Sequence, residues 1–215
     1  MLRPGIFLLA ALGLMTACLG QPHPVKNRFS LAAPEHPEAA GNAAGRRTLL
    51  LGAVTAAPAY DGRALIYRLG PNRYESDFYN EFLAPPTRLL AEVAAGSLTM
   101  ASKRLRVVTA PGLAVADFGL ETHIQDLYGD FRHTPPRAVL TLRFTLNDLR
   151  PTVTKVVLDR LYLCERPLAE DGGPTGLVAA YGLCLADIMA ELARDLDQAV
   201  SPQSPPTSGK KNERK

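Results

Sequence analysis

Apolar and polar residues alternate most regularly over Ala138–Asn147. A period of two with one polar face is typical of a half-buried antiparallel strand. Asn147 and Asp148 then favour a turn, and Thr152–Glu165 forms a second β-rich run. The pattern predicts a β-hairpin whose first strand turns these residues toward the core: Ala138, Leu140, Leu142, Phe144 and Leu146.

Two other stretches repeat apolar residues every three to four positions, which is the period of an amphipathic helix. The first covers Pro86–Ser102. Pro86 suits its first turn, because a proline there lacks only an N–H that would have no partner. The second helix covers Gly176–Val200 and has a continuous apolar stripe of Leu177, Tyr181, Cys184, Leu185, Ile188, Leu192 and Leu196.

Further β-rich runs cover Thr48–Val54, Ala64–Arg68, Leu105–Thr109 and Leu120–Phe131. We expect residues 74–82 to be an aromatic crossover between the second strand and the first helix. One-sided strands and amphipathic helices bury their apolar faces against each other. The sequence therefore predicts a two-layer α+β fold, in which a largely antiparallel sheet of about six strands packs against two helices.

The first 17 residues have the features of a lipoprotein signal peptide. Arg3 gives a positive start, and the apolar run Ile6–Met15 is too short to span a bilayer. The run ends before Cys18 in a sequence that resembles the bacterial lipobox, so Cys18 is the expected lipidation site. An ordinary signal peptide with an incidental cysteine is the alternative. Leu19 replaces the Asp that favours inner-membrane retention in enteric bacteria, so we expect an outer-membrane anchor facing the periplasm.

The remaining chain divides into three parts. Residues 18–45 are rich in Pro, Ala, Gly and His and predict a flexible tether. Residues 46–200 form the domain, and residues 201–215 predict a disordered basic tail, either solvated or touching anionic headgroups. The tail and Arg3 hold the basic excess, which leaves the domain at a net charge of about −1. Nucleic acid is therefore not an expected partner.

Cys164 and Cys184 remain as a pair once Cys18 is assigned to the anchor. In an oxidising compartment an even pair favours a disulfide, and the closed loop would contribute about 3 kcal/mol. Two separate buried thiols are an equal alternative. The sequence leaves both open.

No catalytic signature is visible in the sequence. It has no GxSxG elbow, phosphate-binding glycine loop or metal-ligand spacing of His and Cys. His123 and His133 are expected on the surface, and Glu121, Asp126 and Asp130 are more typical of solvated strand charges than of an acid–base pair. We expect no catalytic residue, no metal site and no cofactor.

The aromatic segment offers the candidate contact residues. Its rings could line an apolar groove for a lipid chain or a partner, or they could fill the core. The core is favoured for Phe78 and Phe82. The candidate contacts for a partner or lipid are Tyr67, Tyr74, Tyr79 and Phe82.

The same stretch resembles a known family. It reads Tyr67-Arg68-Leu69-Gly70-Pro71-Asn72, then Tyr79-Asn80-Glu81-Phe82, then Ala84-Pro85-Pro86. This order resembles the auxiliary lipoprotein component of bacterial ABC-type transport systems, and the resemblance extends from about Arg47 to about Leu196. Relatives of that family accompany MCE-type lipid transporters.

The resemblance implies a non-enzymatic accessory protein. Its expected partners are an ABC permease, an ATPase and an MCE-like substrate-binding protein, with a membrane bound through the anchor and phospholipid as a possible ligand. The alternative is a structural or envelope-assembly lipoprotein that works without a transporter.

Overall fold

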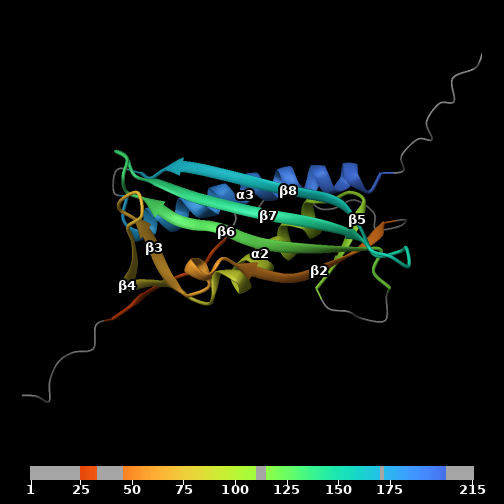
Figure 1. Ribbon diagram of the computed structural model, residues 1–215, viewed down its shortest axis with the longest axis horizontal. Coiled ribbons are helices and arrows are strands. Elements are labelled where there is room, and N and C mark those ends of the chain that lie inside the picture. Colours follow the sequence, from red (N-terminus) through yellow and green to blue (C-terminus); the bar gives the residue numbers. More distant parts are fainter. Residues whose placement is uncertain (1–24, 33–45, 110–114, 170–171, 202–215) are drawn as a thin grey trace, which may run out of the picture.

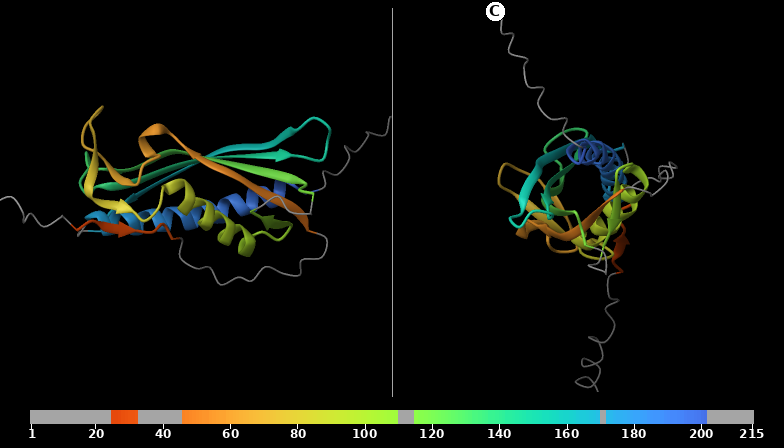
Figure 2. Two further views of the ribbon diagram at one scale, coloured as in Figure 1. Left: turned by 90° about the horizontal axis from the view of Figure 1, so that it is seen from below. Right: turned by 90° about the vertical axis from the view of Figure 1, so that its right-hand side faces the viewer.

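The computed structural model describes residues 25–32, 46–109, 115–169 and 172–201. In this part of the chain, a long twisted sheet is covered on one face by two helices (Figures 1 and 2). The predicted α+β fold with helices packed on a sheet is confirmed. The sheet has eight strands rather than about six.

The helices begin at prolines, which suit a first helical turn. The helices are α2 (Pro86–Ala101) and α3 (Pro174–Ala199), with one 3-10 turn, η1 (Pro58–Tyr60). The strands are β1 (Asn27–Phe29), β2 (Arg47–Ala56), β3 (Ala64–Arg68), β4 (Tyr74–Phe82), β5 (Leu105–Val108), β6 (Phe118–Asp130), β7 (Arg137–Asp148) and β8 (Lys155–Pro167).

The sheet is mixed. Its longest pairings, β6 with β7 and β7 with β8, are antiparallel as predicted. Four shorter pairings are parallel: β1 with β4, β2 with β5, β2 with β6, and β3 with β6. Strand β6 organises the sheet, because β2 pairs along its first half and β3 along its end on the same side.

The core lies between the sheet and the helices. Leu142, Phe144 and Leu146 on β7 are fully buried, as the alternation predicted. The apolar stripe of α3 belongs to the same core cluster, and the helix contacts β7 and β8. This helix is long and apolar enough to cross a membrane by length and composition, but 56% of its most apolar window is buried in the domain, as in the core helix of a globular protein.

The prediction of a flexible tether over residues 18–45 is wrong for residues 25–32. Asn27–Phe29 forms β1 beside β4, and Leu31 is buried. Gly182 on α3 permits this path, because a Cβ there would lie 2.6 Å from the Ala32 carbonyl oxygen. Three residues are too few to display a period, so the sequence pattern could not reveal the strand.

Candidate functional site

The acidic residues that the sequence places on one strand do not form a reacting pair. Asp130 is buried and accepts hydrogen bonds from the Arg132 guanidinium at 2.9 and 2.6 Å. These bonds lower the pKa of Asp130 to about 2. Glu121 lies on the sheet face away from the helices. Among the described residues, no group of three or more His, Cys, Asp or Glu could hold a metal ion.

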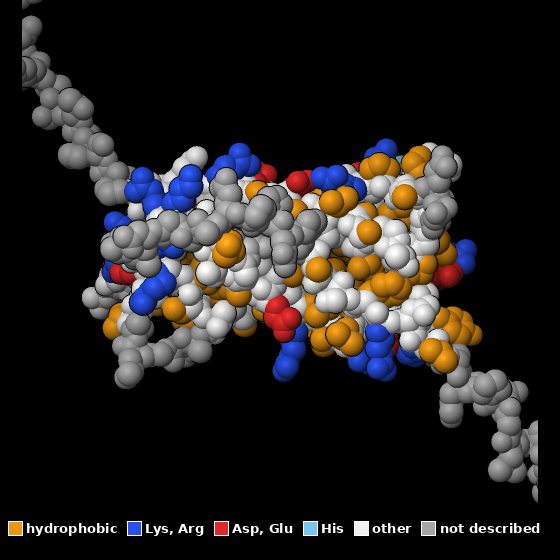
Figure 3. Space-filling model, turned by 180° about the vertical axis from the view of Figure 1, so that it is seen from behind, with side chains coloured by type: hydrophobic (Ala, Val, Ile, Leu, Met, Phe, Trp, Pro, Cys, Tyr) orange, Lys and Arg blue, Asp and Glu red, His pale blue; other side chains and the backbone are white. Residues whose placement is uncertain are grey.

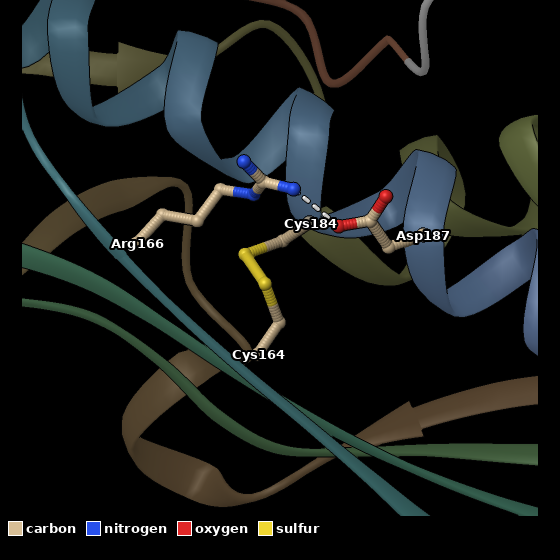
Figure 4. The surroundings of a disulfide bond; sticks show 4 residues. All are labelled: Cys164, Arg166, Cys184 and Asp187. Carbon is tan, nitrogen blue, oxygen red and sulfur yellow. Dashed lines mark hydrogen bonds and ion pairs between the residues drawn. A yellow bond between two sulfur atoms is a disulfide. The ribbon is translucent and has the colours of Figure 1, made fainter.

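The predicted cysteine pair joins the sheet to a helix. Cys164 on β8 and Cys184 on α3 form a disulfide with a Cα–Cα distance of 5.6 Å (Figure 4). Of the two alternatives left open by the sequence, the structure contains the bond. Beside it, Arg166 pairs with Asp187. The disulfide therefore belongs to a side-chain seam that fixes α3 on the sheet edge.

Two of the four candidate contact residues pack inward. Phe82 is 1% exposed and lies against Tyr181, with ring centroids 6.5 Å apart, so its assignment as a partner contact is wrong. Tyr67 is half-buried and donates a hydrogen bond to Asp77 at 2.7 Å. Burial, and then this bond to Asp77, raises the pKa of Tyr67.

Two candidates do face solvent. Tyr74 is 43% exposed and Tyr79 is 54% exposed. Phe78, next to Tyr79, is 63% exposed, so the expectation that favoured a core position for it is wrong. Leu83, at the end of the same segment, is 56% exposed.

An irregularity in β4 explains why Phe78 and Tyr79 face outward. Residues Ala64 and Ile66 on β3 pair with Glu81 and Ser76 on β4, so four residues of β4 stand opposite one residue of β3. Asp77 holds this bulge by accepting hydrogen bonds from the backbone N–H groups of residues 79 and 80 at 2.8 and 2.9 Å. A bulge re-aims the side chains that it carries.

A buried carboxylate fastens β1 beside this bulge. Glu81 is 5% exposed and forms ion pairs with Lys26 at 3.2 Å, Arg28 at 3.2 Å and Arg63 at 3.3 Å. Lys26 first, and then the two arginines, keep the pKa of Glu81 below its ordinary value. Because Lys26 immediately precedes β1 and Arg28 lies within it, this cluster ties the first strand to the sheet.

We expect Glu81→Gln to release β1. The variant removes the charge that three cations share, while the cations themselves remain solvated. Trypsin should then cleave after Lys26 and Arg28 several-fold faster than in the parent protein, because cleavage requires the strand to detach. Mass spectrometry of the fragments measures this rate.

Acidification of the parent protein should also make β1 detach more readily. A carboxylate whose pKa is lowered in the folded state stabilises the fold above its unfolded pKa and loses that contribution as pH falls through the folded value. The Glu81→Gln variant should lack this pH dependence. Equal cleavage rates in the two proteins near neutral pH would contradict the role given to Glu81.

The sheet face away from the helices forms a second surface. It holds an open groove of about 300 Å³, lined by Gly52, Ala53, Thr55, Glu121, Thr122, His123, Arg143 and Thr145. On neighbouring β8, Leu161 and Leu163 are 48% and 62% exposed. We call these β8 leucines and the groove the outer face. Among the described strands, β8 pairs only with β7, so it forms an open sheet edge.

The fold is similar to several solved structures. An uncharacterized protein matches with a TM-score of 0.64 and 17% identity over 80% of this chain and 99% of its own. A Xanthomonas campestris protein matches with a TM-score of 0.64 and 17% identity over 80% and 96%. A hypothetical protein from Chlamydia trachomatis matches with a TM-score of 0.50 and 11% identity over 72% and 97%. At these identities the likeness concerns the fold alone.

Sequence comparison gives the family. No protein among those with curated descriptions matches the chain. The family model for the ABC-type transport auxiliary lipoprotein component matches residues 29–193, which runs from the end of β1 to the last turns of α3. The chain belongs to the family of ABC-type transport auxiliary lipoprotein components.

Proposed function

We propose that the protein is the lipid-anchored, periplasm-facing accessory subunit of an MCE-linked ABC transport system that moves phospholipid or another hydrophobic solute. The observation that carries the proposal is the family match over residues 29–193, which includes nearly every element of the described fold. The proposed partners are a permease, an ATPase and an MCE-like substrate-binding protein. Cys18, which lies outside the described residues, is the proposed lipidation site, and the outer membrane is the proposed location.

The interior of the domain favours docking over lipid carriage. One internal cavity, lined by apolar residues that include Leu31, Leu90 and Tyr181, has a volume of about 10 Å³. A site of that size holds at most one water molecule, whereas ligand pockets usually measure several hundred Å³. The small size of this cavity favours a subunit that acts through its surfaces, with the ATP chemistry carried by another subunit.

The outer face is the proposed contact with the transporter. Neither α2 nor α3 covers it (Figure 2), and its groove lies beside exposed leucines of the edge strand. An open edge offers unpaired backbone groups to which a partner can add a strand, and nearby apolar side chains supply buried area. Arg143 and Asp159 pair across this face and give it a polar component.

Co-purification tests this function. The protein, tagged at its C-terminus, is extracted from membranes in mild detergent, and its partners are identified by mass spectrometry. We expect an ATPase, its permease and an MCE-like protein. Recovery of outer-membrane assembly or cell-wall proteins alone would overturn the transport role and favour the structural lipoprotein instead.

A variant of the outer face tests whether the transporter subunits bind there. Leu161→Asp combined with Leu163→Asp should remove the transporter subunits from the purified complex, because two charges would have to be desolvated at the contact. Leu183→Asp is the matched control, since Leu183 is a similarly exposed leucine on α3. Retention of the partners by the double variant would show that they bind elsewhere.

A further inference from the structure

One end of the molecule carries an apolar surface that the fold leaves uncovered. Val25, Phe78, Tyr79 and Leu83 are 86%, 63%, 54% and 56% exposed, and we call them the β4 tip. Figure 3 shows hydrophobic side chains gathered at the corner where the described chain begins. Large apolar side chains clustered at a surface mark a site of interaction, whereas single ones are ordinary.

The β4 tip is held in place by its surroundings. The rings of Phe78 and Tyr79 lie edge to face, with centroids 5.2 Å apart, and the Lys26 ammonium lies 5.0 Å from the centre of the Phe78 ring. Asp77 fixes the backbone beneath them through the two N–H groups described above. The rings are therefore presented outward by a bulge with its own hydrogen bonds.

The charge around the tip suits an anionic surface. Lys26, Arg28 and Arg63 surround the Glu81 carboxylate, and the Asp77 carboxylate lies beneath the rings, which leaves a net charge of +1 beside the apolar residues. Aromatic rings next to basic side chains are the composition of protein segments that lie in the headgroup region of a membrane. Each basic residue near an anionic bilayer adds to the attraction.

The first residue of the β4 tip, Val25, follows closely after the proposed lipidation site in the sequence. Seven Cα–Cα steps separate Cys18 from Val25. Fully extended, they span at most about 25 Å. An anchor at Cys18 would therefore keep Val25, and the rest of the tip with it, close to the bilayer that holds the acyl chains.

We propose that the β4 tip inserts into the lipid interface as a second membrane contact beside the anchor. Bilayer lipid with anionic headgroups is its ligand, and no protein partner is needed. In Figure 1, β4 and β5 lie at opposite ends of the long axis. Insertion at the β4 end therefore makes the molecule stand away from the membrane and leaves the outer face open along its side.

The absence of tryptophan makes the insertion measurable. The chain contains no Trp, so Phe78→Trp introduces a single fluorescent reporter into the tip. The protein used is residues 19–215, which keeps every described residue and lacks the leader and the lipidation site. The probes are vesicles of phosphatidylethanolamine and phosphatidylglycerol with brominated acyl chains, which quench a buried indole.

We expect vesicles to shift the emission of Trp at position 78 to the blue and to quench it at least about twofold. Leu163→Trp is the matched control, because Leu163 is equally exposed but lies on the outer face. Its emission should not change. An unquenched reporter at position 78, or equal quenching at both positions, would overturn the proposal.

A second measurement separates hydrophobic insertion from charge attraction. Phe78→Ser combined with Tyr79→Ser should lower partitioning onto these vesicles about tenfold or more, since both rings lose their burial in lipid. Circular dichroism checks that the variant is folded. Partitioning that is unchanged in the variant would also overturn insertion by the tip.

The orientation rests on the proposed lipid anchor, but the insertion does not. Quenching at position 78 together with a failed co-purification would keep the membrane contact and remove the transport role. Recovery of the transporter with no quenching at position 78 would keep the transport role and remove the membrane contact. The two proposals therefore fail separately.

Discussion

Replacement of Phe82 by alanine is expected to lower the free energy of unfolding by about 3–5 kcal/mol, whereas the same replacement at Phe78 should change it by less than about 0.5 kcal/mol. The two phenylalanines lie four residues apart on β4, but Phe82 is 1% exposed and Phe78 is 63% exposed. Removal of the buried ring leaves a cavity against Tyr181. Urea denaturation followed by circular dichroism measures both losses.

The pair is its own control, because the amino-acid change and the strand are the same. Equal m-values in the two variants would indicate that the loss at Phe82 comes from the native state and not from a more compact denatured state. If Phe78→Ala proved as costly as Phe82→Ala, the tip would be part of the core and its proposed contact with lipid would lose its basis.

The different environments of Phe78 and Phe82 were not predictable from the sequence pattern. A regular strand turns residues separated by an even number of positions toward the same side, so Phe78 and Phe82 are expected to share one environment. The bulge at Asp77–Asn80 breaks that relation. Its cause is the Asp77 carboxylate, which binds backbone N–H groups, and a hydrogen bond of that kind leaves no hydrophobic period in the sequence.

The long elements were predictable for a physical reason. β7 and α3 each bury one continuous face, so their burial leaves a repeated signal of period two or period 3.6. β1 has three residues, and β4 is polar for most of its length, so neither gives such a signal. β1 and β4 pair with each other at the end of the sheet where Glu81 forms its ion pairs. These ion pairs join three separate segments of the chain, so no local pattern predicts them.

The disulfide was predictable from the sequence only in part. The stripe of α3 placed Cys184 toward the sheet, and the hairpin placed Cys164 near the end of β8. Whether they meet depends on how far the helix is shifted along the strand. The shift is set by contacts across the seam, in which Arg160 pairs with Asp195 at 2.6 Å and the Tyr162 hydroxyl donates to the same carboxylate at 2.6 Å. No local pattern contains that information.

Loss of the disulfide is expected to destabilise the domain by about 3 kcal/mol, since the bond closes a loop over a sequence separation of 20 residues. For a domain of this size, such a loss lowers Tm by roughly 6–12 °C. The change is Cys164→Ala combined with Cys184→Ala, with alanine chosen because Cys184 is fully buried and a serine hydroxyl there would lack a partner. Thermal melts followed by circular dichroism, with and without reductant, measure the shift.

Reductant should lower the Tm of the parent protein by a similar amount and leave the double variant unchanged, because the variant has no bond to reduce. The seam that surrounds the bond should keep the reduced domain folded, since its ion pairs and hydrogen bonds join β8 to α3 without the sulfur atoms. The prediction fails if residues 19–215, unfolded without reductant, present two reactive thiols. In that case Cys164 and Cys184 are separate buried thiols, and the side-chain seam alone holds α3 in register with the sheet.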